Sequence, residues 1–317
     1  MQEIYNNNNS NNEINLLELF QILFKGKWII VSITTFISVI AVIYSLSMPN
    51  IYESKALLAP VDSANSISGA LRNYSGLAGL AGINLPSATD ESNATKAVTK
   101  LHSLSFFEDN TLPNIFLPDL MAVKSWDHKT NSVRYDEDIY IKNSNTWVRK
   151  YSYPKKQVPS AQEGFIEFKK KHLNISEDTK TGFITLSIRH KSPFIAKQWA
   201  ELLVSEVNSF YRQKDKFESE KAVAFLNKQI VMTSLSEVKE VVAKLLQDET
   251  QKLTLIEANQ YYVFDYIDPP AVMEKKSEPK RFLICIIGAV FGSLLSIILV
   301  LTRHYFFSKE SSQDYHS

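Results

Sequence analysis

The sequence predicts an α+β protein in which two terminal transmembrane helices flank a large domain with a membrane-proximal mixed sheet and a very long projecting helix. Three observations indicate this fold class. Uncharged apolar runs occupy residues 28–48 and 282–301, near the two ends of the chain. Apolar and polar residues alternate along 183–190, as in a half-buried strand. No proline or glycine occurs from Phe194 to Asp268, a stretch rich in helix-forming residues.

Each apolar run is about 20 residues long, which is enough for a helix to cross roughly 30 Å of hydrocarbon. Lys25 and Lys27 precede the first run, and basic residues there favour a cytoplasmic N-terminal side. We therefore expect cytoplasmic tails at 1–27 and 302–317 and one extramembrane domain at 49–279. A cleaved signal peptide is the alternative, but the first run is longer than a typical signal-peptide core.

The charge balance argues against a nucleic-acid partner. The chain has 35 Lys+Arg against 34 Asp+Glu, so no general basic field is expected. The only cysteine, Cys285, lies inside the second apolar run. The extramembrane domain therefore has neither a disulfide nor a thiol nucleophile. No cofactor is predicted.

The sequence contains no recognisable catalytic or metal-binding motif. Its six histidines do not show the spacing of metal ligands. Acidic residues at 108–109 and 136–138 could be paired carboxylates of a glycoside hydrolase, but adjacency in sequence does not set the separation that this mechanism needs. We interpret them as solvated acidic turns, and no G-x-S-x-G nucleophile motif is present. The protein is therefore predicted not to be an enzyme.

The extramembrane domain is predicted to begin and end with strands. Residues 51–59 and 261–267 are rich in β-branched, aromatic and other apolar residues, and each lies near an apolar run. A hairpin is expected between them, because 173–176 and 183–190 flank a turn that ends at Gly182.

Two shorter helices are predicted before the hairpin. Residues 94–108 have apolar positions at helical spacing. Ser160 and Glu163 form a capping box that opens a helix to about residue 172. With the long helix that follows the hairpin, the element order is that of a split β-α-β arrangement.

Three segments have a less definite pattern. Residues 16–24 predict either a short interfacial helix or an extension of the first span. The glycine-containing stretch 63–88 predicts either a flexible loop or a mobile apolar flap that touches lipid or a neighbouring subunit. The aromatic and proline-containing stretch 112–159 permits no assignment.

The long helix is expected to span about residues 194–260, and a break near Thr233 is the alternative, because Ser234–Glu237 has the pattern of a capping box. Apolar residues recur every seven positions and form a narrow seam. We expect this seam to pack on its own domain near the base and on copies of itself further out. The candidate oligomer seam consists of Leu203, Phe210, Phe217 and Val231.

Small residues form one face of the second span. Gly288, Gly292 and Ser296 recur every four residues, a spacing that permits close contact with another helix in lipid. Glycine is also common in transmembrane helices for other reasons, which is the alternative explanation. These three residues are the candidate transmembrane packing site.

These features together resemble the Wzz-type polysaccharide co-polymerases, which determine the chain length of lipopolysaccharide O antigen and related surface glycans. The resemblance lies in the two terminal spans, the LAGLAGINL stretch, the strand-to-helix junction 183–199, the long helix and the proline-containing segment before the second span. Pro269, Pro270 and Pro279 form this candidate span-entry segment. The family has prolines about every third residue there, and Met273 and Lys276 depart from that pattern.

The resemblance implies a bacterial inner-membrane protein with a periplasmic domain that assembles into a closed ring of identical subunits. It implies the O-antigen polymerase and an undecaprenyl-diphosphate-linked glycan as partners, and a non-enzymatic role in setting the modal chain length. Relatives in capsule or exopolysaccharide export have a cytoplasmic tyrosine-kinase domain or partner, whereas this sequence contains no G-x-x-x-x-G-K-[ST] motif. The alternatives are a periplasmic adaptor or sensor of an export or signalling complex, and a membrane-tethered glycan hydrolase.

Overall fold

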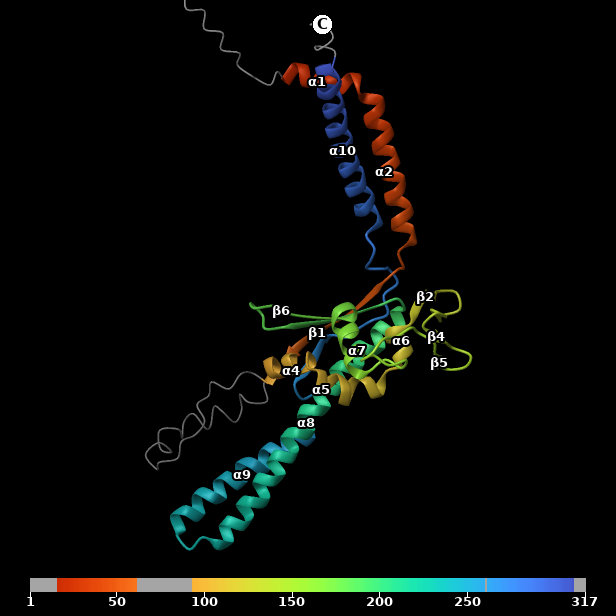
Figure 1. Ribbon diagram of the computed structural model, residues 1–317. Coiled ribbons are helices and arrows are strands. Elements are labelled where there is room, and N and C mark those ends of the chain that lie inside the picture. The colour runs from red at the N-terminus through yellow and green to blue at the C-terminus, as the bar shows by residue number, and fades with distance from the viewer. Residues whose placement is uncertain (1–15, 62–92, 260, 311–317) are drawn as a thin grey trace, which may run out of the picture. The chain divides into compact units, whose positions relative to one another are not determined.

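The computed structural model of the protein describes residues 16–61, 93–259 and 261–310 (Figure 1). The chain forms two compact units. The terminal unit combines the segments up to Pro49 and from Glu278 onward, and the central domain comprises Asn50–Ser277. The stretch 63–88, predicted as a loop or a flap, lies outside the described residues.

The terminal unit contains three helices, α1 (Leu16–Lys25), α2 (Lys27–Ser47) and α10 (Arg281–Glu310). Residues 27–47 and 281–304 are each long and apolar enough to cross a membrane, in agreement with the two predicted spans. The chain turns at Gly26, and α1 contacts both α2 and α10. Residues 16–24 therefore form a separate helix rather than an extension of the span.

The central domain is built on a four-stranded sheet of β1 (Tyr52–Pro60), β6 (Leu173–Glu177), β7 (Ile184–His190) and β8 (Phe264–Asp268). The spatial order is β6-β7-β1-β8, which is the split β-α-β order that the sequence predicts.

The predicted mixed sheet is wrong, because β1 pairs antiparallel with both β7 and β8, and β6 pairs antiparallel with β7. Each helical connection joins two strands of the same direction, but a third strand lies between them. No two parallel strands are therefore neighbours.

The core lies between this sheet and the helices of the domain. The alternating residues of β7 face inward, and Leu186 pairs with Ala56 of β1 at the centre of the sheet. Both side chains are completely buried. The base of α8 (Pro193–Met232) packs on β1 and β7 and buries Leu203, Val204 and Val207 in the same cluster.

A layer of short helices completes this core. It consists of α4 (Asn93–Leu101), α5 (Leu104–Phe106), a π-helical turn at Phe107–Thr111, a 3₁₀ turn at Leu112–Asn114, α6 (Leu117–Met121) and α7 (Ala161–Glu167). A π-helical turn at Phe168–His172 continues α7. The helix predicted at 94–108 is interrupted, because the Ser103 hydroxyl accepts a hydrogen bond from the Phe106 amide and starts a new helix. The predicted capping box of Ser160 and Glu163 is confirmed.

The stretch 112–159, which the sequence left without assignment, forms two small hairpins after α6. One pairs β2 (Val123–Asp127) with β3 (Ser132–Tyr135). The other pairs β4 (Tyr140–Ile141) with β5 (Thr146–Trp147). They are too short for periodicity to reveal.

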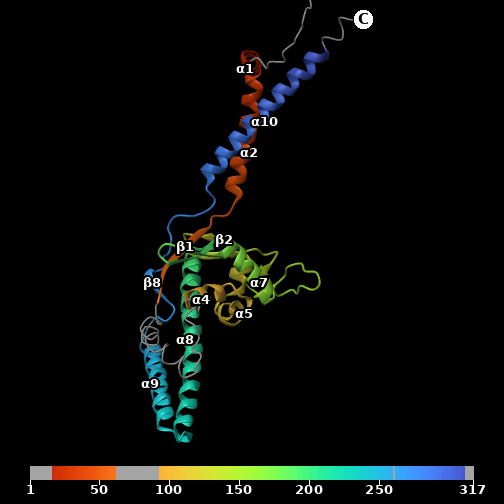
Figure 2. The same ribbon diagram turned by 90° about the vertical axis from the view of Figure 1, so that its left-hand side faces the viewer.

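The prediction of a single helix over 194–260 is wrong. The helix is broken near Thr233, which is the alternative that the capping pattern suggested. The chain leaves α8 after Met232 and returns as α9 (Ser236–Ala258). The two helices pack side by side as an αα-hairpin (Figures 1 and 2). One face of α9 explains the return, because Val242, Leu246 and Leu253 are half-buried and Ile256 is buried.

Asn208 of α8 holds the returning chain in place. Its buried side-chain oxygen accepts hydrogen bonds from the backbone amides of Tyr262, Val263 and Phe264, at 3.3, 2.7 and 2.9 Å. Its amide nitrogen donates to the Phe264 carbonyl at 3.0 Å. One side chain therefore satisfies four backbone groups at the start of β8, where no neighbouring strand does so.

Substitution Asn208→Ala is expected to lower the stability of the central domain by about 3 kcal/mol, because several buried backbone groups lose their partner. Thermal unfolding of the full chain in detergent, followed by circular dichroism, measures the effect. Asn174→Ala on exposed β6 is the matched control and should leave the melting temperature nearly unchanged. Equal melting temperatures for the two variants would contradict this role of Asn208.

Candidate functional site

The predicted small-residue face of α10 lies against α2. A β-carbon added to Gly288 would lie 2.5 Å from the Cβ of Ala41. At Gly292 it would lie 3.2 Å from the Cβ of Ile37 and 3.3 Å from the Cα of Thr34. The two helices approach this closely only because neither glycine has a side chain.

Ser296 continues this face and is completely buried. Its hydroxyl donates a hydrogen bond to the carbonyl of Ser293 at 2.8 Å, so this buried polar group has its partner within α10. Gly26, between α1 and α2, is a further close approach that the sequence did not single out. A β-carbon there would lie 2.5 Å from Cγ1 of Val300 on α10.

The prolines of the span-entry segment occupy two places. Pro269 is exposed and Pro270 is buried, and both directly follow β8. The chain after them is held by the hydroxyl of Ser54, which donates to the Ala271 carbonyl at 2.8 Å. Pro279 is buried and lies two residues before α10. The prolines thus stand at the two ends of an extended connection between β8 and α10.

The candidate oligomer seam divides into two parts. Leu203 is 1% exposed and Phe210 packs on the core, edge to face with Phe106 at 6.0 Å between ring centroids. Leu203 is therefore buried by its own domain, and Phe210 is half-buried against the same core. Phe217 and Val231, further along α8, are 57% and 81% exposed.

Phe217 and Val231 belong to a larger set of exposed apolar side chains on the helical hairpin, which we call the hairpin apolar surface. Eight large apolar side chains are exposed between Phe217 and Leu245 along this one pair of helices, which is more than the scattered single ones that need no explanation. The surface extends over both helices and the turn between them. It consists of Phe217, Phe225, Val231, Met232, Leu235, Val238, Val241 and Leu245.

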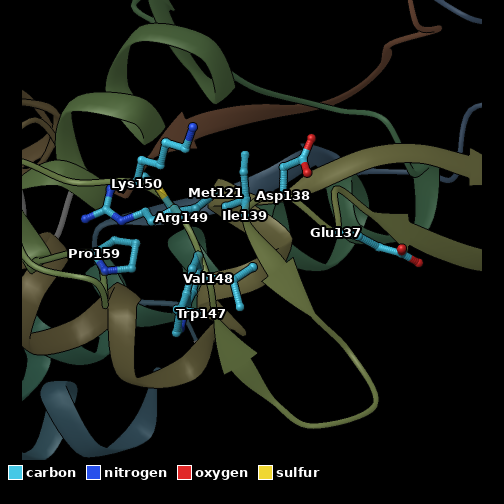
Figure 3. Close-up of a pocket in the computed structure, with 9 residues that line it drawn as sticks. All are labelled: Met121, Glu137, Asp138, Ile139, Trp147, Val148, Arg149, Lys150 and Pro159. Carbon is cyan, nitrogen blue, oxygen red and sulfur yellow. The ribbon is translucent and has the colours of Figure 1, made fainter.

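A pocket of about 780 Å³ lies beside the second small hairpin of the central domain. Met121, residues 137–139, residues 147–150 and Pro159 line it (Figure 3). Figure 3 shows Arg149 and Pro159 on one side of the pocket and Asp138 and Glu137 on the other. The predicted solvated acidic turn at 136–138 therefore contributes to a concave surface, which the sequence did not indicate.

Two histidines lie together in the core and are held neutral. His190 donates from Nε2 to the Asp119 carbonyl at 3.0 Å and accepts at Nδ1 from the Ser192 amide at 2.9 Å. His172 donates from Nδ1 to the Arg189 carbonyl at 2.7 Å. Both rings contact Trp199. Burial lowers the pKa of His172 to about 4 and that of His190 to about 3, because desolvation penalises the charged form.

Three features of the structure are candidates for function: the close packing of α2 and α10, the hairpin apolar surface and the pocket. No group of three or more metal-ligating side chains occurs among the described residues. Residues 12–102 match the family model for Wzz, chain length determinant protein. The matched segment is less than a third of the 317-residue chain. It contains α1, α2, β1 and α4, and the resemblance predicted from the sequence is confirmed for it.

Two solved structures are similar to the chain. A full-length bacterial polysaccharide co-polymerase has 13% sequence identity and a TM-score of 0.40, and covers 93% of this chain and 99% of that chain. A fragment of WzzB, a polysaccharide co-polymerase from Salmonella Typhimurium, has 14% identity and a TM-score of 0.32, and covers 72% of this chain and 100% of that chain. No curated protein matches the chain.

The double substitution Gly288→Leu with Gly292→Leu is expected to separate α2 from α10, because the added carbons have no room beside Ala41 and Ile37. Protease protection of the full chain in membrane vesicles, with expression level as a second measure, reports the change.

The matched control for this pair is Ile287→Leu with Val290→Leu, which alters exposed positions on the same turns of α10. Protection should fall for the glycine variant and remain as in the unsubstituted protein for the control. Identical protection of both variants would mean that the close approach of the two helices is dispensable.

Acid is expected to destabilise the central domain through His172 and His190. Their folded pKa values lie below the ordinary value near 6.5, so the unfolded chain binds more protons and stability falls as pH drops from about 6.5 toward about 4. Between pH of about 7 and about 5, each histidine accounts for roughly 2 kcal/mol of this loss.

The double variant His172→Gln with His190→Gln should therefore show a smaller difference in melting temperature between those two pH values, although its stability near neutral pH is lower. His128→Gln, in an exposed turn, is the control and should retain the full difference. An unchanged pH dependence in the double variant would exclude the buried histidines as its source.

Proposed function

We propose that this protein regulates the modal chain length of lipopolysaccharide O antigen or a related surface polysaccharide. The observation that carries the proposal is the match of residues 12–102 to the chain length determinant family. That segment includes the first candidate span and the first strand of the sheet. The match therefore covers both a proposed membrane anchor and the beginning of the central domain.

The proposed mechanism is scaffolding without catalysis. Both spans anchor the protein in the bacterial inner membrane, with the termini in the cytoplasm and the central domain in the periplasm, as Lys25 and Lys27 favour. Copies of the chain assemble into a closed ring beside the O-antigen polymerase. The ring positions the polymerase and the undecaprenyl-diphosphate-linked glycan, and thereby sets the number of repeats added.

The hairpin apolar surface supports the assembly step. The chain itself leaves this surface exposed along both helices, while the residues nearer the base of α8 are used for the domain core. A second copy of the chain is the occupant that we propose, because each copy in a closed ring contacts its two neighbours through two different patches, and the exposed apolar residues lie on both helices of the hairpin.

Deletion of the gene is expected to remove the modal cluster from an electrophoretic ladder of the host surface polysaccharide, leaving short and unregulated chains. Restoring the gene should restore the cluster. A ladder of unchanged distribution would reject the proposed function, and the adaptor or sensor of an export or signalling complex would then be the better hypothesis.

Substitutions Phe217→Asp with Val231→Asp are expected to abolish the modal cluster in the same assay, because each places a charge in the apolar contact between copies. The folded chain should persist, since both side chains are exposed. Ser205→Asp with Asn227→Asp adds the same charge at exposed polar positions of α8 and serves as the control.

The oligomeric state of both double variants, measured by light scattering in detergent, separates assembly from other effects. The aspartate pair in the hairpin apolar surface should give smaller particles, and the control pair should not. If the hairpin variant assembled normally and retained the modal cluster, this surface would not be the contact between copies.

A further inference from the structure

The pocket beside the second small hairpin is rigidly built. Arg149 joins the loop that closes it to α7, because its guanidinium donates to both carboxylate oxygens of Glu163 at 2.7 and 2.9 Å. The same guanidinium donates to the carbonyls of Lys156 and Gln157 at 2.5 and 2.9 Å. Four hydrogen bonds from one side chain thus fix the loop 150–159, so that a ligand need not order it on binding.

The loop is also fastened to the strand that carries the aromatic wall. The side chain of Gln157 donates to the Trp147 carbonyl at 2.6 Å. The Trp147 ring packs against Tyr140, with 5.2 Å between centroids, and Tyr140 is buried. The hydroxyl of Tyr140 donates to Asn145 in the turn of the hairpin. Trp147 therefore has a fixed position in the pocket wall.

The lining combines an apolar surface with acceptors and a donor. Met121, Ile139 and Trp147 supply the apolar part. Asp138 supplies carboxylate oxygens that accept hydrogen bonds, and Lys150 supplies an ammonium group that donates them. Neither the Asp138 nor the Lys150 side chain is engaged by another of the described residues. In Figure 3 the carboxylate of Glu137 points away from the other lining residues, so Glu137 marks the rim.

We propose that this pocket binds a neutral saccharide unit of the glycan whose length the protein controls. A pyranose ring has an apolar face of C–H groups, which suits Trp147, and hydroxyl groups around its edge, which suit Asp138 and Lys150. The volume of about 780 Å³ is within the range of small-molecule sites and accommodates one or two sugar rings. This inference rests on the proposed function for the identity of the glycan.

The charges available in the pocket balance one another. Arg149 is paired with Glu163, and the Glu137 carboxylate lies at the rim, so Lys150 and Asp138 are the charged lining groups that remain for a ligand. One positive and one negative charge suit a neutral polyhydroxyl ligand, whose hydroxyl groups accept a hydrogen bond from Lys150 and donate one to Asp138.

The test uses the full chain in lipid nanodiscs and the host surface polysaccharide freed from its lipid by mild acid. Saturation-transfer-difference NMR detects contact with sugar protons, and titration yields the dissociation constant. Trp147→Ala is expected to weaken binding about tenfold, because the apolar platform is lost. Trp147→Phe retains an aromatic ring and should bind nearly as well as the unsubstituted protein.

Asp138→Asn should weaken binding about fivefold, because it replaces a charged acceptor by a neutral one. Asp109→Asn makes the same change at an exposed acidic position outside the pocket and should bind as the unsubstituted protein does. Melting temperatures of all variants show whether each one is folded.

Absence of saturation transfer from the unsubstituted protein to the sugar protons would overturn the site. So would folded Trp147→Ala and Asp138→Asn variants that bind as tightly as the unsubstituted protein. Binding is measured without polymerisation, so this result is independent of the polysaccharide ladder. An unchanged ladder after deletion with variant-sensitive binding would reject length control and keep the saccharide site. A changed ladder with variant-insensitive binding would do the reverse.

Discussion

The burial of the first turns of α8 against β1 and β7 is the contact on which the central domain depends. Small and large apolar residues alternate along this helix face, from Ala196 through Leu203 to Val207, and meet the inward side chains of β7. Because both strands are completely covered here, the sheet has one dry face against which the shorter helices also pack. The buried amide of Asn208 on the same helix then determines where β8 joins the sheet.

The same helix changes its role along its length. Near the base its side chains form the core, and beyond Tyr211 it packs along α9, with Asp215 accepting a hydrogen bond from the Tyr262 hydroxyl. An isolated pair of helices buries one face of each and leaves the others in water, which is why apolar residues there remain exposed. The exposed set is a property of the hairpin geometry, and assembly with further copies is the role that we propose for it.

The terminal unit and the pocket illustrate two ways of preparing a contact. In the terminal unit, the absence of side chains at Gly288 and Gly292 lets α2 and α10 approach closely, which is the kind of packing that associates helices in lipid. In the pocket, the Arg149 guanidinium donates hydrogen bonds to Glu163 and to two backbone carbonyls, and these bonds fix the loop 150–159. What remains in the lining is an aromatic wall with a few polar groups, a combination suited to sugars.

The sequence by itself determined the two candidate spans, the strands β1, β6, β7 and β8, the capping box at Ser160 and the split β-α-β order, because these depend on local composition and periodicity. It also indicated the small-residue face of α10. Only the tertiary structure decided that the sheet is antiparallel throughout, that the long helix folds back after Met232, and that Leu203 and Phe210 belong to the core while Phe217 and Val231 do not. A heptad seam records which residues share a helix face, but what covers that face depends on the partners that folding brings to it.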